Sequence, residues 1–97
     1  MRKITKLAVQ SFLDRKEFQL SNTRVETDEA SSSLFLFENK IAILNRQGAM
    51  FVSLGGYHYT RTTQERLNAL PGVSVGKAKG EVYLNGLKWD GKFVMVN

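Results

Sequence analysis

Aromatic and basic side chains are concentrated between residues 53 and 70, in the stretch SLGGYHYTRTTQERLNAL. Cations beside aromatic rings suit the binding of nucleic acid, because cations attract phosphates and rings stack on bases. Two further lysines lie in GKAKG, residues 76–80, which we expect to form a flexible basic turn. The sequence therefore predicts a surface that binds nucleic acid or a partner protein, formed by Tyr57, His58, Tyr59, Arg61, Arg66, Lys77 and Lys79.

The sequence contains few groups that could catalyse a reaction or hold a metal ion. It has no cysteine and one histidine, which excludes disulfides, thiol chemistry and a histidine-based metal cluster. A serine triad would need Ser53, His58 and a distant carboxylate, and nothing in the pattern brings these groups together. Asp28 and the run from Glu38 to Lys40 have the layout of a magnesium-dependent nuclease site, but a charged hairpin turn explains the same residues. We therefore expect no enzyme activity, no metal and no cofactor.

A helix after the glycine pair Gly55-Gly56 must position most of the candidate binding residues. Glycine permits a positive φ or a close backbone approach where the preceding strand ends. Thr62 and Glu65 have the spacing of a capping box, which predicts that the helix starts at Thr62, and Pro71 ends it. The threonines and arginine at residues 60–63 could hold a single phosphate at the helix N-terminus, although ordinary capping explains the same threonines.

The buried side of this helix is supplied by Leu67 and Leu70. Arg66 and Asn68 do not fit that side, so we expect them to face outward or to cap a neighbouring group. The predicted binding surface depends on this orientation, because Arg66 belongs to it.

The whole chain, residues 1–97, is predicted to form one α+β domain. An amphipathic helix with Thr5 as its N-cap is expected from Thr5 to about Arg15. Period-two and β-branched patterns predict strands at residues 23–27, 33–37, 41–44 and 50–54 before the second helix, and at 73–75, 81–84, 87–89 and 93–96 after it. The result is an antiparallel β-sheet of about six strands with two short helices, in the order α-β-β-β-β-α-β-β-β, with Asn85-Gly86 as the strongest hairpin signal.

The central strands are apolar at consecutive positions, so both of their faces favour burial. Two short helices can cover one face of such a sheet. The other face then requires sheet curling, the C-terminal hairpin or another subunit, and we therefore expect docking of a partner or a homodimer.

Charge is distributed unevenly along the 97 residues, whose net charge is +5. The net charge is +4 over residues 1–16, −4 over 17–38, +2 over 39–59 and +3 over 60–97. Two basic ends that flank an acidic segment could attract phosphates, although a mildly basic soluble protein has the same balance. No apolar run reaches the roughly 18 residues of a membrane-spanning helix, so we expect a soluble intracellular protein.

The chain resembles a group of small proteins of tailed bacteriophages. The resemblance rests on the basic start MRKITKLAVQSFL, the threonine-rich run into E-R-L-N at residues 65–68, and the segment VYLNGLKWDG at residues 82–91. It covers most of the chain and agrees in the order of three segments. It implies a bacteriophage origin, and hence the host cytoplasm, but no particular activity.

These observations lead to three functional hypotheses. The first is a non-enzymatic bacteriophage accessory protein that binds nucleic acid or a nucleic-acid-handling host protein. The alternative is a dimeric protein-interaction module that inhibits a host enzyme or defence component, because the strands are apolar on both faces. The third is a small hydrolase or nuclease that uses Glu38 and Mg²⁺.

Overall fold

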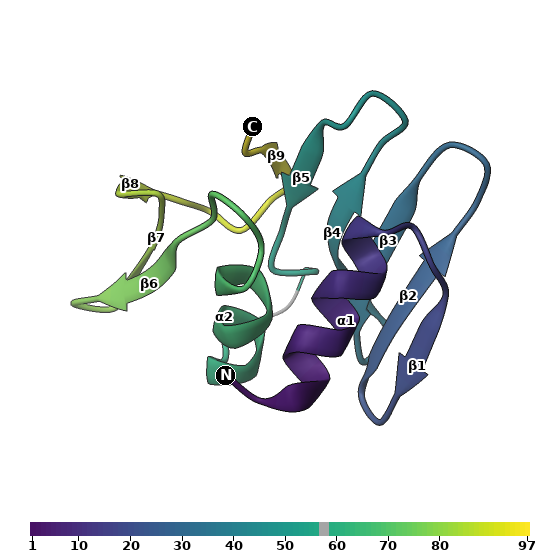
Figure 1. The fold of residues 1–97 in the computed structure, drawn as a ribbon. Coiled ribbons are helices and arrows are strands. Elements are labelled where there is room, and N and C mark those ends of the chain that lie inside the picture. Colours follow the sequence, from purple (N-terminus) through teal and green to yellow (C-terminus); the bar gives the residue numbers. More distant parts are fainter. Residues whose placement is uncertain (57–58) are drawn as a thin grey trace.

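Two helices and nine short strands succeed one another along residues 1–56 and 59–97, the part of the chain that the computed structural model describes (Figure 1). The helices are α1 (Lys3–Leu13) and α2 (Arg61–Asn68), and neither is long and apolar enough to cross a membrane. The strands between the helices are β1 (Phe18–Leu20), β2 (Thr23–Thr27), β3 (Ser32–Leu36), β4 (Asn39–Leu44) and β5 (Met50–Val52). The strands after α2 are β6 (Val75–Ala78), β7 (Glu81–Leu84), β8 (Leu87–Lys88) and β9 (Val94–Met95).

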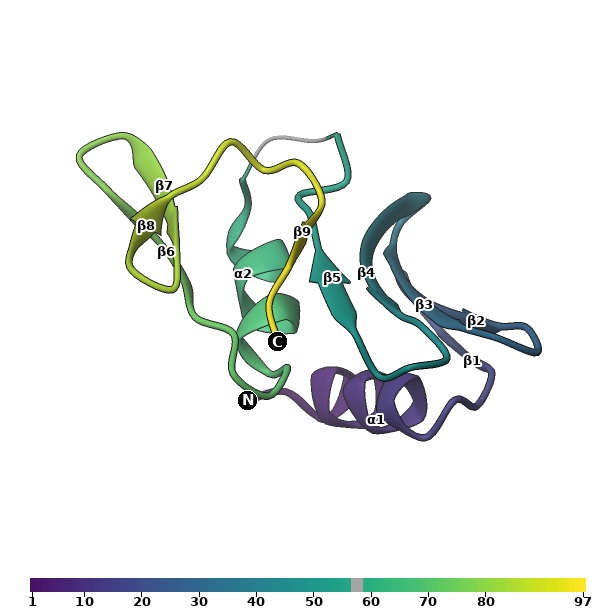
Figure 2. The same ribbon diagram turned by 90° about the horizontal axis from the view of Figure 1, so that it is seen from above.

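The strands form two antiparallel sheets. The larger sheet has the order β1-β2-β3-β4-β5-β9, and the smaller has the order β6-β7-β8. Both helices lie on one side of the larger sheet, and the smaller sheet stands beside α2 (Figures 1 and 2). The predicted α+β architecture of two helices and an antiparallel sheet of six strands is confirmed. β1 is an additional strand, between the first helix and residue 23, where the sequence predicts none.

The core lies between α1 and the larger sheet. Ala8, Val9 and Phe12 recur on one face of α1 and are buried against the first three strands. Val25 of β2 and Leu34 of β3 are paired in register and are also buried. Burial of each large apolar side chain contributes about 1.5–3 kcal/mol relative to exposure. The apolar stripe of α1 and the alternating pattern of the strands place these side chains on the faces that pack together.

The other face of the larger sheet carries apolar side chains that neither α1 nor α2 covers. Ile43 and Phe51 are paired in register and half-buried, and Met95 follows opposite Phe51 with 54% of its surface exposed. Phe35 is half-buried beneath the Arg24 guanidinium, which lies 4.2 Å from the ring centroid. We call Phe35, Ile43, Phe51 and Met95 the open sheet face; it is the second apolar face that the sequence predicted.

Both predicted helix N-caps are wrong. Thr60, not Thr62, caps α2: its backbone is extended and its hydroxyl accepts a hydrogen bond from the Thr63 N–H at 3.1 Å. Arg2 is the N-cap residue of α1, without a side-chain cap, and Thr5 lies buried inside the helix. A threonine two residues before the expected start can cap equally well, and the carboxylate expected in the capping box is engaged elsewhere.

Two turns also differ from their predicted positions. The strand predicted over residues 33–37 ends at Leu36, and Phe37 lies in the following turn with φ of 56° and 55% exposure, so its expected burial is wrong. The turn expected at residues 76–80 is shorter, because β6 continues to Ala78. Lys79 and Gly80 both have positive φ, 52° and 80°, which is the geometry of a two-residue hairpin turn.

Candidate nucleic-acid interface

Three of the predicted binding residues come together at the start of α2. The Lys77 ammonium lies 5.8 Å from the centroid of the Tyr59 ring, within the range of a cation–π contact. Tyr59 is half-buried and packs against the core, whereas Arg61 and Lys77 are exposed. Burial raises the pKa of Tyr59, and the charge of the nearby Arg61 opposes that effect. The phenol therefore stays neutral beside two cations.

The position of Lys77 beside Tyr59 follows from one side-chain amide. Asn68, the last residue of α2, accepts a hydrogen bond from the Val75 N–H at 2.6 Å and donates one to the Val75 carbonyl oxygen at 3.1 Å. The amide thereby holds the first residue of β6 against α2, and Lys77 follows two positions later on the same face of the strand. Asn68 caps a neighbouring group, which is one of the two roles predicted for it.

Lys79 extends the basic surface to the tip of the β6–β7 hairpin. The hairpin projects from the rest of the molecule, so Lys79 is exposed on its turn (Figure 1). Glu81, on the other side of the turn, forms an ion pair with Lys88 at 2.9 Å. Among the described residues, no carboxylate forms an ion pair with Arg61, Lys77 or Lys79. We call Tyr59, Arg61, Lys77 and Lys79 the Tyr59 patch.

Arg66 does not belong to this patch, and its predicted outward orientation is wrong. Its side chain is 1% exposed and lies between α1, α2 and β2. The guanidinium donates hydrogen bonds to Thr5 Oγ1 at 2.6 Å, to Thr23 Oγ1 at 3.2 Å and to Glu65 Oε1 at 2.7 Å. Burial lowers the pKa of Arg66, the charge of Arg2 lowers it further, and Glu65 opposes both. A buried cation needs such partners, and the two buried threonines on α1 and β2 supply them.

The pH dependence of stability is expected to report on the carboxylate in this cluster. The Thr5 hydroxyl, and then Arg2, donate to Glu65 and hold its pKa below the ordinary value of 4.5. A lowered folded pKa contributes stability that is complete above the ordinary value and is lost as pH falls through the folded value. We therefore expect the difference in unfolding free energy between the wild type and Glu65→Gln to shrink as pH falls below 4.5.

Urea unfolding of both proteins across this pH range measures that difference. Glu17 and Asp28 also have lowered pKa values, because backbone N–H groups donate to them, but both carboxylates are present in both proteins and cancel in the comparison. A difference that stays constant, or grows toward acid, would contradict the role given to Glu65.

Tyr57 and His58, the remaining predicted binding residues, lie outside the described residues. Their predicted part in the surface stays a prediction.

The nuclease-like layout is not assembled by the fold. Asp28 precedes β3 and Glu38 follows it, so the two carboxylates lie at opposite ends of that strand. Asp28 accepts hydrogen bonds from the N–H groups of Ala30 and Ser31, which stabilise its own loop. Glu38 pairs with Arg24 at 3.4 Å. Within residues 1–56 and 59–97, no group of three or more acidic, histidine or cysteine side chains is placed to hold a metal ion.

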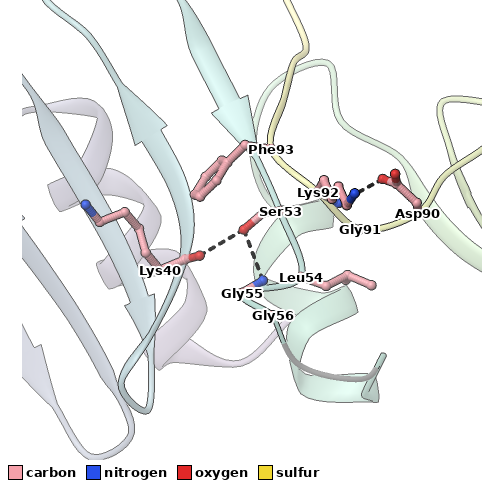
Figure 3. A pocket seen from close by; sticks show the side chains of 9 residues that line it. All are labelled: Lys40, Ser53, Leu54, Gly55, Gly56, Asp90, Gly91, Lys92 and Phe93. Carbon is pink, nitrogen blue, oxygen red and sulfur yellow. Dashed lines mark hydrogen bonds between the residues drawn. The ribbon is translucent and has the colours of Figure 1, made fainter.

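A hollow of about 610 Å³ lies where β5 ends, beside the loop before β9 (Figure 3). At its floor, the Ser53 hydroxyl donates to the Lys40 carbonyl oxygen at 2.9 Å and accepts from the Gly55 N–H at 3.0 Å. Asp90 accepts from the Lys92 N–H at 2.9 Å. The Lys40 side chain is directed away from Ser53 (Figure 3). These polar side chains hydrogen-bond to backbone groups of the two loops, so we assign no catalytic role to the hollow.

The hydroxyls of two buried serines are expected to have opposite effects on stability. Ser32 Oγ is buried and has no hydrogen-bond partner among the described residues, whereas Ser53 Oγ has the two partners given above. Ser32→Ala removes an unsatisfied group and should raise the unfolding free energy by up to about 1 kcal/mol. Ser53→Ala should lower it by about 1–2 kcal/mol. Urea unfolding checks both, and a Ser32→Ala variant less stable than the wild type would show that this hydroxyl has a partner.

Sequence reasoning placed Tyr59, Arg61, Lys77 and Lys79 on one surface but missed the cluster that buries Arg66. The available signal was the pair of threonines, Thr5 and Thr23, at positions where an apolar stripe and a strand face would otherwise continue. Buried hydroxyls at such positions indicate a polar partner in the core.

Comparison with known proteins gave a match over nearly the whole chain. A family model described as Kyanoviridae Gp96 protein matches residues 1–95. No curated protein and no solved structure matches the chain.

Proposed function

The chain belongs to the Kyanoviridae Gp96 protein family, and from this premise we propose that it is a bacteriophage accessory protein that binds nucleic acid through the Tyr59 patch. The bacteriophage origin predicted from the sequence is confirmed by the family. The proposed activity is binding and not catalysis, and the proposed place of action is the host cytoplasm.

The observation that carries this proposal is the Lys77 ammonium over the Tyr59 ring, with the exposed Arg61 beside it. An exposed cation–π contact is worth about 0.5–1 kcal/mol. Stacking of a base on an aromatic ring is worth about 1–3 kcal/mol, so a base can displace Lys77 from the ring. The displaced ammonium is then free to contact a phosphate, which couples the two favourable interactions.

Single strands suit this patch better than duplex does. One half-buried ring offers its face to an unstacked base, and a duplex exposes no base face to it. Three cations on single-stranded nucleic acid give a salt slope of about −2, since each phosphate contact contributes about 0.7. Affinity should therefore fall about 20-fold between about 50 mM and 200 mM salt.

Fluorescence anisotropy of labelled single-stranded and duplex oligonucleotides tests the proposal. The variant Arg61→Ala/Lys77→Ala/Lys79→Ala should lose the salt-sensitive binding to the single strand. The control Lys3→Ala/Lys6→Ala/Lys16→Ala removes the same charge from exposed positions on and after α1 and should retain it. Absence of wild-type binding to any nucleic acid at about 50 mM salt, or equal losses in both variants, would contradict the proposal.

A second candidate function is a protein-interaction module that inhibits a host enzyme or defence component. It is favoured by the open sheet face, where Ile43 and Phe51 remain half-buried and Met95 is exposed. Affinity capture from infected cells, with and without nuclease treatment, separates the two candidates. A partner that stays bound after nuclease treatment favours the second, and a partner that is lost favours the first.

A further inference from the structure

We propose that a second copy of this chain pairs with the free edge of β9, so that the two larger sheets join across a two-fold axis. This inference is independent of nucleic-acid binding, because the β9 edge and the Tyr59 patch share no residue.

β9 ends the larger sheet and, within residues 1–56 and 59–97, is paired on one side only, with β5. The Val96 N–H donates to the Met50 carbonyl oxygen at 2.8 Å. Peptide groups alternate in direction along a strand, so the N–H and C=O of Met95 point away from β5, toward the free side. An edge of this kind favours addition of another extended strand.

Exposed apolar side chains gather at this edge. Of the eight large hydrophobic side chains that are exposed among the described residues, four lie here, and such a concentration indicates an interface. They are Leu87 at 74%, Met95 at 54%, Phe93 at 46% and Val94 at 40% exposure. The segment from residue 93 to 96 contains no charged residue and no proline, the usual means by which an edge strand is protected from pairing.

The strand that fits this edge must be apolar on both of its faces. One face of that strand meets a groove of about 440 Å³ between β9 and the segment over residues 84–89, whose lining includes Leu84, Leu87 and Trp89. On the other side, it continues the open sheet face beyond Met95. The chain's own segment Phe93-Val94-Met95-Val96 is apolar at all four positions, so a second copy supplies the side chains that both faces require.

Antiparallel self-pairing also satisfies the register. Residues whose peptide groups point outward must face one another, and the proposed register places Phe93 opposite the partner's Met95 and Val94 opposite the partner's Val94. The first pair brings a thioether against an aromatic ring, a favourable contact. Lys92 then faces the partner's Val96, so no like charges meet.

Light scattering coupled to size exclusion tests the proposal on the full chain. The wild type should have twice the 11.0 kDa mass of one chain. Met95→Pro removes an N–H that points away from β5, so it should give a folded monomer. Val96→Pro is the matched control, because it removes the hydrogen bond to Met50 and should loosen β9 itself.

A charge-swap experiment tests the dimer through β9 even if the proline variants fail to fold. Val94→Lys and Val94→Glu each place like charges directly opposite one another across the two-fold axis, so each should be monomeric. An equimolar mixture should recover the dimer. A wild type that is monomeric at every concentration, a dimer that survives both single Val94 variants, or a mixture that stays monomeric would overturn the proposal.

Discussion

Arg66→Ala is expected to lower the free energy of unfolding by about 3–5 kcal/mol, because it removes a large, fully buried side chain together with the hydrogen bonds that this side chain donates. The guanidinium is 1% exposed and joins Thr5 on α1, Thr23 on β2 and Glu65 on α2. Its removal leaves two buried hydroxyls without their donor and opens a cavity among three elements. Because small domains have about 5–15 kcal/mol of total stability, this is a large fraction.

Urea unfolding of Arg66→Ala beside Arg61→Ala measures this effect on two arginines of the same helix. Arg61 is exposed and should change stability by no more than about 0.5 kcal/mol. Should Arg66→Ala fail to fold, Arg66→Lys provides the measurement, since an ammonium lacks the planar fork and should lose part of the same energy. An Arg66 variant as stable as Arg61→Ala would mean that the buried cluster contributes nothing.

Gly55→Ala is expected to lower the free energy of unfolding by about 2–4 kcal/mol, from left-handed strain and overpacking together. Gly55 has φ of 74°, and a Cβ there would lie 2.6 Å from the Asn39 Cβ at the start of β4. That Cβ is fixed to the backbone, so β4 or the chain after β5 must shift. The close backbone approach predicted from the sequence for this glycine pair is confirmed at Gly55.

Gly56→Ala is the matched control for that substitution. Gly56 has a similar φ of 70°, but no atom of the described residues, apart from its chain neighbours, lies within 4 Å of a Cβ placed on it. It should therefore show the strain alone, about 1 kcal/mol. Thermal unfolding of the two variants separates the cost of left-handed strain from the cost of overpacking. Equal losses of stability would show that Asn39 can shift without a cost.

Much of the fold follows from local patterns in the sequence. The stripe Ala8, Val9, Phe12 specifies α1, and Asn85-Gly86 specifies a hairpin turn, with φ of 51° and 84°. Patterns of this kind act within a few residues. Such patterns do not decide between two nearby residues that could fill the same role. Thr60 rather than Thr62 caps α2, although either threonine side chain can accept the capping hydrogen bond.

The charged residues of the candidate site were predictable only where they are exposed. Arg61, Lys77 and Lys79 face solvent, as charged side chains usually do. The prediction for Arg66 was wrong because its partners lie 43 and 61 residues away in the sequence, on β2 and α1. A charged residue in the core depends on such distant partners, and the pattern of apolar residues along α2 does not predict them.

The most direct test of nucleic-acid binding at the Tyr59 patch is the salt dependence of affinity for a single-stranded oligonucleotide. For Lys77→Ala, the slope of log K against log salt should be smaller than that of the wild type by about 0.7, one lost phosphate contact. Lys6→Ala, an exposed lysine on α1, should keep the wild-type slope. Unchanged slope in Lys77→Ala, or an equal reduction in both variants, would contradict a binding site at this patch.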